Sequence, residues 1–442
     1  MSGPTERRGL LTFAQEDIWD LYQRSRGAPW QNVYSVVDVE GEIDEAALEQ
    51  ALHGLVRRHE PLRTIYEPAG DGAQAVVMAA SPFALERVDL SDGGAVASLA
   101  ADLAAHRFVL ERGPLFRAVL ARRAERRRTL LLCLDHTCAD GWSLQVLARD
   151  LAALYAAATG GGPEPPSLVH QCLDYAVWER ERAVSEKGRA ERRWWVERLC
   201  EPPVSPVAVS RRPTLPVPYV RGSRLVLRVP PAHARAWEAG ARALRASLFV
   251  LLLAALQSVV ERRTGNDDPV IGTRAAARTA RSSRLAGAFR NTLVLRAPRT
   301  PSGHVDRARD GVLAALDRQL TPFPALAADL AQRGVDAAGL LRVMLLLDGS
   351  AFSGLRLGEA ALIERYPVGP LSTPPLDEEP AEPAVLGLDR LVLRSMDAVT
   401  LYVRPEGGGL WLFFFYKTDL MRDDEARDWL EDAIALLIDS IR

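Results

Sequence analysis

The residues with the clearest chemical potential lie in the stretch LDHTCADGWSL, residues 134–144. His136 stands four residues before Asp140, and Gly141 follows the acid directly. Because a histidine has an ordinary pKa of about 6.5, its neutral ring can accept a proton from a nucleophile at pH 7. The same pattern is also typical of a turn histidine whose hydrogen bonds are satisfied locally. No GxSxG nucleophile motif accompanies the stretch, so these residues alone leave both interpretations open.

The neighbouring sequence indicates which elements hold this stretch. Residues 115–136 predict a β-hairpin with RRAERRR as its polar turn. Its second arm, 130–134, is apolar at every position, which is typical of a strand covered on both faces. After Ser143, apolar residues recur every three to four positions, so we expect an amphipathic helix with Ser143 as its N-cap. His136 should therefore lie on the turn between a buried strand and a helix.

The rest of the chain mixes helical and strand-like segments without strict alternation, which predicts an α/β protein of the α+β sandwich kind. A length of 442 residues favours two domains or lobes. We assign the N-terminal lobe to residues 1–180 and the C-terminal lobe to residues 181–442. Residues 172–199 predict a long charged helical stretch. The Pro-rich segments 202–218 and 366–386 are interpreted as the link between the halves and as a mobile loop.

The composition excludes several classes of partner. A net charge of −2 gives no basic excess for binding nucleic acid or a membrane surface. The most apolar run, residues 248–256, is shorter than the roughly 20 residues that a membrane span needs. The four cysteines form no CxxC pair and no zinc spacing, so we expect neither disulfides nor a metal site. The N-terminus has no signal-peptide core, and we expect a cytoplasmic protein.

The motif His136-x-x-x-Asp140-Gly141 resembles the HHxxxDG core motif of nonribosomal peptide synthetase condensation domains, which belong to the chloramphenicol acetyltransferase-like superfamily. Other segments resemble further motifs of the family in the family's order: LTFAQEDIWDLYQ (11–23), RRHEPLRTIY (57–66), LDYAVWERER (173–182), IGTRAAARTA (271–280) with AFRNTLVLR (288–296), and YKTDLM (416–421). Together they extend over nearly the whole chain. One position departs from the motif, because its first histidine is Asp135 here.

The resemblance implies two chloramphenicol acetyltransferase-like lobes that form a V with a central tunnel. Acyl or peptidyl carrier proteins would dock at its mouths and deliver substrates on phosphopantetheine arms. The chain itself would hold no cofactor and no metal. The acceptor would be a small molecule or a second carrier-bound group.

The resemblance also implies roles for individual residues. His136 takes the place of the catalytic histidine, which orients or deprotonates an amine or hydroxyl that attacks a thioester carbonyl. Asp140 would be structural and would form an ion pair with Arg278 across the lobe interface. Gly141 would let the acyl arm pass close to the backbone. The candidates for contact with substrate along the tunnel are Trp142, Ser143 and Asn291.

Two interpretations of the Asp135 side chain remain open. Its carboxylate braces the turn and faces away from the tunnel, or it touches the imidazole of His136 and raises the pKa of that ring. Consecutive residues of an extended strand point to opposite faces, which favours the bracing role.

The function that follows is that of a free-standing condensation enzyme of natural-product biosynthesis, such as antibiotic biosynthesis. It would join a carrier-bound acyl or aminoacyl thioester to an amine or hydroxyl, forming an amide or an ester. Two alternatives remain. One is a catalytically degenerate condensation-like module that binds carrier proteins or recruits a tailoring enzyme. The other is an acyltransferase that uses a soluble thioester donor.

Overall fold

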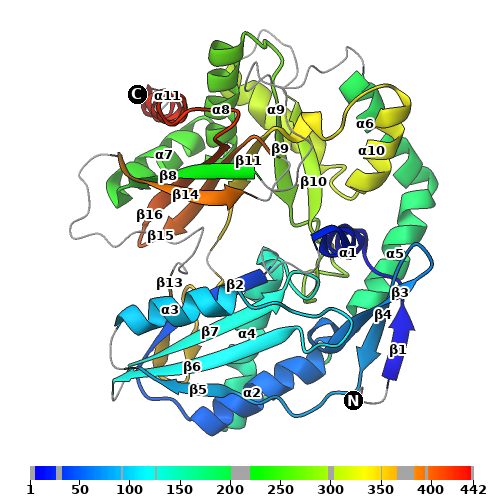
Figure 1. The fold of residues 1–442 in the computed structure, drawn as a ribbon, viewed down its shortest axis with the longest axis vertical. Helices are drawn as coiled ribbons and strands as arrows, with labels where there is room; N and C mark the ends of the chain where they lie inside the picture. Colours follow the sequence, from blue (N-terminus) through cyan, green and yellow to red (C-terminus); the bar gives the residue numbers. More distant parts are fainter. Residues whose placement is uncertain are drawn as a thin grey trace. The chain divides into compact units, whose positions relative to one another are not determined.

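A computed structural model of the 442-residue chain describes residues 5–25, 32–90, 93–124, 127–200, 220–296, 303–349, 351–365, 383–393 and 397–439. Helices and strands are mixed along the chain, as the sequence predicts for an α/β protein (Figure 1). The Pro-rich segment 202–218 lies outside the described residues, and so does most of 366–386. The last residues of that second segment begin strand β14 (Ala384–Leu393) instead of continuing a loop.

The chain divides into two compact units, and neither is one continuous stretch. The first unit combines Met1–Arg182, Ala276–Arg290 and Ser350–Ser372. The second combines Ala183–Ala275, Asn291–Gly349 and Thr373–Arg442. The first break therefore lies close to the boundary expected after residue 180, but two later segments also belong to the first unit.

The larger sheet of the first unit has β7 near its centre. Its strand order is β12 (Arg356–Leu357), β13 (Ala360–Arg365), β2 (Asn32–Glu40), β7 (Arg127–Asp135), β6 (Phe116–Ala124) and β5 (Glu86–Asp89). The predicted hairpin is confirmed, because β6 and β7 pair in antiparallel register. Strand β7 is buried continuously from Thr129 to Asp135, as expected for an arm that is apolar at every position.

Helices α2 (Glu45–Arg58) and α4 (Gly141–Ala158) pack against each other in the same core. Asp44 starts α2, because its side chain accepts hydrogen bonds from the backbone N–H groups of Ala46 and Ala47. The helix ends at Arg58, and Pro61 lies in the following 3₁₀ turn, Glu60–Arg63. The other described elements of this unit are α1 (Phe13–Ser25), α3 (Gly93–Ala104), most of α5 (Cys172–Val184), and a small sheet of β1 (Thr5–Gly9), β4 (Gly72–Met78) and β3 (Thr64–Ala69).

The helical stretch expected over 172–199 is confirmed, and it consists of two helices. Helix α5 ends at Val184, and α6 (Glu186–Cys200) begins after Ser185. The hydroxyl of Ser185 accepts a hydrogen bond from the Gly188 N–H at 3.1 Å, which is the geometry of an N-cap. The charged pattern continues across this serine, so the sequence did not reveal the break at which its side chain starts a new helix.

The second unit is built on one mixed sheet of seven described strands. Their order is β10 (Asn291–Arg296), β9 (Val270–Ala275), β11 (Val343–Leu347), β15 (Val399–Glu406), β16 (Gly409–Lys417), β8 (Val220–Val229) and β14. Its described helices, besides α6, are α7 (Pro231–Ala243), α8 (Leu248–Thr264), α9 (His304–Leu316), α10 (Phe323–Gln332) and α11 (Asp423–Asp439). This unit shows the mixture of helices and strands without strict alternation that the sequence predicts.

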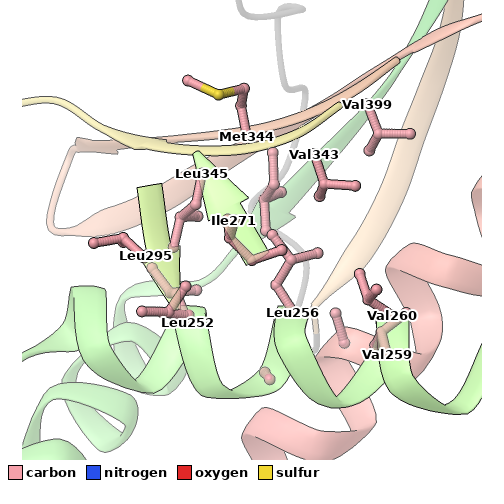
Figure 2. Close-up of a cluster of buried hydrophobic side chains, with 14 of the residues drawn as sticks. Leu252, Leu256, Val259, Val260, Ile271, Leu295, Val343, Met344, Leu345 and Val399 are labelled. Atoms are coloured by element: carbon pink, nitrogen blue, oxygen red, sulfur yellow. The ribbon is translucent and has the colours of Figure 1, made fainter. Parts of the chain in front are cut away.

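Helix α8 forms the centre of this second core. Figure 2 shows Leu252, Leu256 and Val259 directed at side chains of the sheet, including Ile271 of β9 and Val343 of β11. No single helix among the described residues is long and apolar enough to cross a membrane. Helices α7 and α8 pass that test only as a pair, by length and composition, and they are bent by 92° at their break.

Candidate active site

His136 lies on the tight turn that connects β7 to α4, as the sequence predicts. Its Nδ1 is 2.7 Å from the carbonyl oxygen of Ala139. A carbonyl oxygen can only accept a hydrogen bond, so Nδ1 carries the proton of the neutral ring. Nε2 is then the basic nitrogen, and the turn fixes its direction.

The electrostatic surroundings of His136 keep its ring neutral. Burial and the positive charge of Arg290 lower the pKa of His136 to about 4, although the Ala139 carbonyl and the Asp140 carboxylate act in the opposite direction. At pH 7 the imidazole is therefore unprotonated and able to take up a proton. Arg290 closes the segment 276–290 and belongs to the same compact unit as His136.

Asp135, the residue that departs from the family motif, is buried next to His136. Its Oδ1 accepts hydrogen bonds from the backbone N–H of Thr137 at 2.9 Å and from the hydroxyl of Thr137 at 2.7 Å. Burial raises the pKa of the Asp135 carboxyl to about 6, and these hydrogen bonds limit the increase. Such contacts with neighbouring donors are those expected if Asp135 braces the turn.

Asp140 caps helix α4, and the prediction that Ser143 is the N-cap was wrong. The Asp140 carboxylate accepts a hydrogen bond from the Ser143 N–H at 2.8 Å, and this contact caps the first turn of the helix. Both residue types are good N-caps. Asp140 is the N-cap because helix α4 begins at the next residue, Gly141. Ser143 is the third residue of the helix and therefore cannot be its N-cap.

The predicted ion pair between Asp140 and Arg278 is confirmed. Arg278 Nη2 contacts Asp140 Oδ1, and the side chains are only 5% and 4% exposed. Arg278 also donates from Nη1 to the carbonyl oxygens of Ser282 at 2.9 Å and Leu285 at 2.8 Å. Its guanidinium lies 4.3 Å from the ring centre of Phe289. One part of the prediction needs correction, since Arg278 belongs to the same compact unit as Asp140 and does not reach across from the second unit.

The second oxygen of Asp140 extends this network. Asp140 Oδ2 accepts a hydrogen bond from the Phe289 N–H at 3.0 Å. The hydroxyl of Ser143 lies 2.8 Å from both Asp140 Oδ1 and the Gly287 carbonyl oxygen, and it accepts hydrogen bonds from Arg278 and the Gly287 N–H. The turn that carries His136 is thus tied to segment 276–290 by several buried polar contacts.

The remaining candidates from the sequence occupy different settings. Gly141 is exposed as the first residue of α4. Trp142 is 37% exposed, and its indole N–H donates to the Ser283 carbonyl at 2.9 Å. Ser143 is fully buried in the Asp140 network. Asn291 belongs to the second unit, where its amide donates to the carbonyl oxygens of Gln319 and Thr321.

Gln15 of α1, which was not among the residues predicted from the sequence, also supports the turn of His136. Gln15 Nε2 donates to the Thr137 carbonyl and to the Tyr66 hydroxyl, both at 2.9 Å. Its Oε1 accepts from the Thr12 N–H at 3.0 Å, and Thr12 Oγ1 accepts from the Gln15 N–H at 3.1 Å. This reciprocal pair is a capping box, and the spacing Thr-x-x-Gln could have identified it.

The geometry suits proton transfer better than metal chemistry. Within the described parts of the chain, no group of three or more His, Cys, Asp or Glu residues is placed to hold a metal ion. The described structure instead offers one neutral imidazole with a fixed tautomer, held by a buried ion pair and a capping box. Such a group has the chemistry to accept a proton from a nucleophile that approaches Nε2.

Comparison with known proteins identifies the family. The family model for the condensation domain matches residues 6–355. The dimodular nonribosomal peptide synthase of Bacillus subtilis is 33% identical over 335 residues, which is 72% of this chain but 14% of that protein. Phosphinothricin tripeptide synthetase PhsB of Streptomyces viridochromogenes is 32% identical over 77% of this chain and 30% of its own length. The chain therefore spans a small part of these relatives.

Solved structures agree on the fold. The first condensation domain of the calcium-dependent antibiotic synthetase, in complex with a substrate analogue, has a TM-score of 0.75 at 18% identity and covers 99% of this chain and 97% of its own. The SgcC5 protein of Streptomyces globisporus has a TM-score of 0.72 at 24% identity, with 98% of both chains covered. The chain thus belongs to the condensation-domain family of nonribosomal peptide synthesis, a family of acyltransferases with the chloramphenicol acetyltransferase-like α/β fold.

Proposed function

We propose that this chain joins a carrier-bound acyl or aminoacyl thioester to an amine or hydroxyl, with His136 as the base. The observation that carries the proposal is the hydrogen bond from His136 Nδ1 to the Ala139 carbonyl, because it leaves Nε2 as the proton acceptor at the position of the family's catalytic histidine. The lowered pKa of His136 supports the same role, since the ring is neutral at pH 7.

The reaction can be written with this one side chain as the proton carrier. Nε2 takes the proton of the acceptor amine or hydroxyl while the acceptor nitrogen or oxygen attacks the thioester carbonyl. The carbon–sulfur bond then breaks, and the imidazolium returns the proton to the leaving thiolate. The Asp140–Arg278 pair takes no proton in this scheme and holds the turn in position.

The proposed substrates follow from the family. Phosphopantetheine arms of acyl or peptidyl carrier proteins would supply the thioester, and an amine acceptor would give an amide. A hydroxyl acceptor would give an ester by the same attack. We further propose that the chain acts free-standing in the cytoplasm on carrier proteins supplied in trans, within a pathway such as antibiotic biosynthesis.

Intact-mass analysis tests this function. The chain is mixed with an acyl-loaded carrier protein and an aminoacyl-loaded carrier protein, and the mass of each carrier is followed with and without the chain. We expect the acyl mass to move to the acceptor carrier only when the chain is present. Retention of both carriers in a stable complex without transfer would instead support a carrier-binding module. Transfer from a soluble thioester at the same rate would support the soluble-donor alternative.

The pH dependence of the reaction should report the lowered pKa of His136. A base whose pKa is lowered to about 4 is mostly neutral from about one pH unit above that value, so the wild-type rate should fall only below about pH 5. Asp135→Asn should keep most of the activity and the same acid limb, because Asp135 bonds to Thr137. Rates measured between roughly pH 3 and pH 9 check this, because an acid limb is resolved only when rates are also measured below its midpoint.

Arg290→Gln is the matched variant for this pH series. It removes a positive charge that lowers the pKa of His136, so its acid limb should move to higher pH. A clear shift of the Asp135→Asn limb to lower pH would contradict the bracing role, because it would mean that the Asp135 carboxylate raises the pKa of His136.

Gln15→Ala should slow the reaction without moving its pH profile. The substitution removes the donor to the Thr137 carbonyl, which lies in the turn of His136, and a displaced base can cost roughly ten- to hundredfold in rate. The kcat and the pH profile of folded protein are the measurements. Gln257→Ala is the matched control, because Gln257 is a buried glutamine of α8 in the second unit. Equal effects of the two variants on kcat would exclude a positioning role for Gln15.

A further inference from the structure

The first unit contains a cavity of about 570 Å³ that no residue of the candidate site lines. Its walls come from the end of α2, the start of β3, the segment 79–84 and residues 112–118 at the start of β6. We call it the β6 cavity. Its volume lies within the range of roughly 300–1,000 Å³ that is usual for small-molecule sites.

The inner wall of the β6 cavity is apolar and partly aromatic. Val56, Ile65 and Met78 contribute aliphatic and thioether groups. The rings of Phe83 and Phe116 are stacked, with centres 4.9 Å apart and planes inclined by 22°. Aromatic rings and a methionine sulfur favour a flat aromatic ligand, because both make directional contacts with its ring.

The charged groups at the β6 cavity are mostly cationic. Arg63, Arg112, Arg117 and Glu86 line it, and Arg117 is paired with Glu86 at 2.6 Å. Arg63 donates to the Met78 carbonyl in the wall. The exposed guanidinium of Arg112 makes no hydrogen bond or ion pair with any residue that the structure describes. The guanidinium of Arg112 therefore lies at an apolar cavity without a negatively charged partner among the described residues.

We propose that the β6 cavity binds an aromatic carboxylic acid. The ring system lies against Phe83, Phe116 and Met78, and the carboxylate pairs with Arg112. A planar guanidinium can bind a carboxylate through two parallel hydrogen bonds, which matches one unpaired arginine to one acid group. The surrounding apolar wall disfavours an acid without a sizeable apolar body, because such a ligand would bury too little surface.

The site is separate from the reaction proposed above. The two places are adjacent, because the wall residue Leu115 accepts a hydrogen bond from the Asp135 N–H at 3.0 Å, but no residue of the candidate site lines the β6 cavity. Binding needs neither a carrier protein nor turnover. Failure of the binding experiment therefore says nothing about acyl transfer, and failure of acyl transfer says nothing about binding.

Isothermal titration of the full chain with biphenyl-4-carboxylate tests the proposal. We expect saturable binding, with the neutral biphenyl-4-carboxamide at least about tenfold weaker, because a charge-assisted contact is lost. Arg112→Gln should weaken the acid about tenfold and leave the amide unchanged. Arg149→Gln is the matched control, since Arg149 is an exposed arginine of α4 outside the cavity lining.

Hydrogen exchange with and without the acid locates the ligand. Slowed exchange should be confined to the segments 56–65, 78–86 and 112–118, which line the β6 cavity. The proposal is overturned if the acid does not saturate the protein, if the amide binds equally well, or if Arg112→Gln and Arg149→Gln act alike. Protection at other segments alone would also overturn it.

Discussion

Replacing His136 with alanine is expected to lower the rate of acyl transfer by about two to four orders of magnitude, with the fold retained. The substitution removes the only side chain that the proposed scheme uses to carry a proton. It leaves the Asp140–Arg278 pair and the hydrogen bonds of Asp135 untouched. The intact-mass assay gives the rate, and circular dichroism with thermal unfolding reports whether the variant is folded.

His53→Ala is the matched control for this result. His53 lies on α2 of the same unit, away from the turn that carries His136, so its loss should leave the transfer rate close to that of the wild type. Turnover near the wild-type rate by folded His136→Ala would remove His136 from the mechanism. The interpretation as a module that only binds carrier proteins would then gain support.

Asp140→Ala is expected to destabilise the protein by roughly 3–5 kcal/mol, because it leaves the buried Arg278 guanidinium without its counter-charge. It also removes the cap of α4 and the acceptor of the Phe289 N–H. Urea unfolding of wild type and variant measures the difference in the free energy of unfolding. The activity of Asp140→Ala should fall as well, since the turn of His136 loses its anchor.

An exposed ion pair supplies the comparison. Asp89 is 81% exposed and lies 3.7 Å from Arg122, so Asp89→Ala should cost less than about 1 kcal/mol. If the two aspartate variants lose the same small amount of stability, the Asp140–Arg278 pair does not hold the turn. The role assigned to Asp140 would then be wrong.

Local patterns account for the parts of the fold that the sequence could predict. The β6–β7 hairpin and α4 follow from apolar runs and three- to four-residue spacing within one stretch, and both were located closely. Helix α3 (GGAVASLAADLA) was missed because its few polar positions show no clear periodicity, and its structure depends on packing in the core. The break at Ser185 was not predicted from the sequence. A serine between two charged helical segments indicates the N-cap of a second helix only where the chain changes direction, and the sequence does not show such a change.

Contacts of the candidate site between residues far apart in the sequence could be predicted only where a known family motif includes them. Arg278 lies 138 residues from Asp140 in the sequence, and only the resemblance to condensation domains connected the two. The Thr-x-x-Gln spacing reveals that Gln15 caps α1, but its contact with Thr137, 122 residues away, follows from tertiary packing. The effect of Arg290 on the pKa of His136 is likewise a property of the assembled unit.

The three-part composition of the first unit has a consequence for protein synthesis. A nascent chain that has reached Arg182 contains β7, α4 and His136, but it lacks Ala276–Arg290 and Ser350–Ser372. Asp140 can therefore contact Arg278 and Phe289 only after the whole of strand β9 and the helices before it have been synthesised. Domains usually fold from the N-terminus as they emerge. Here the turn of His136 is completed only after much of the other unit has been translated.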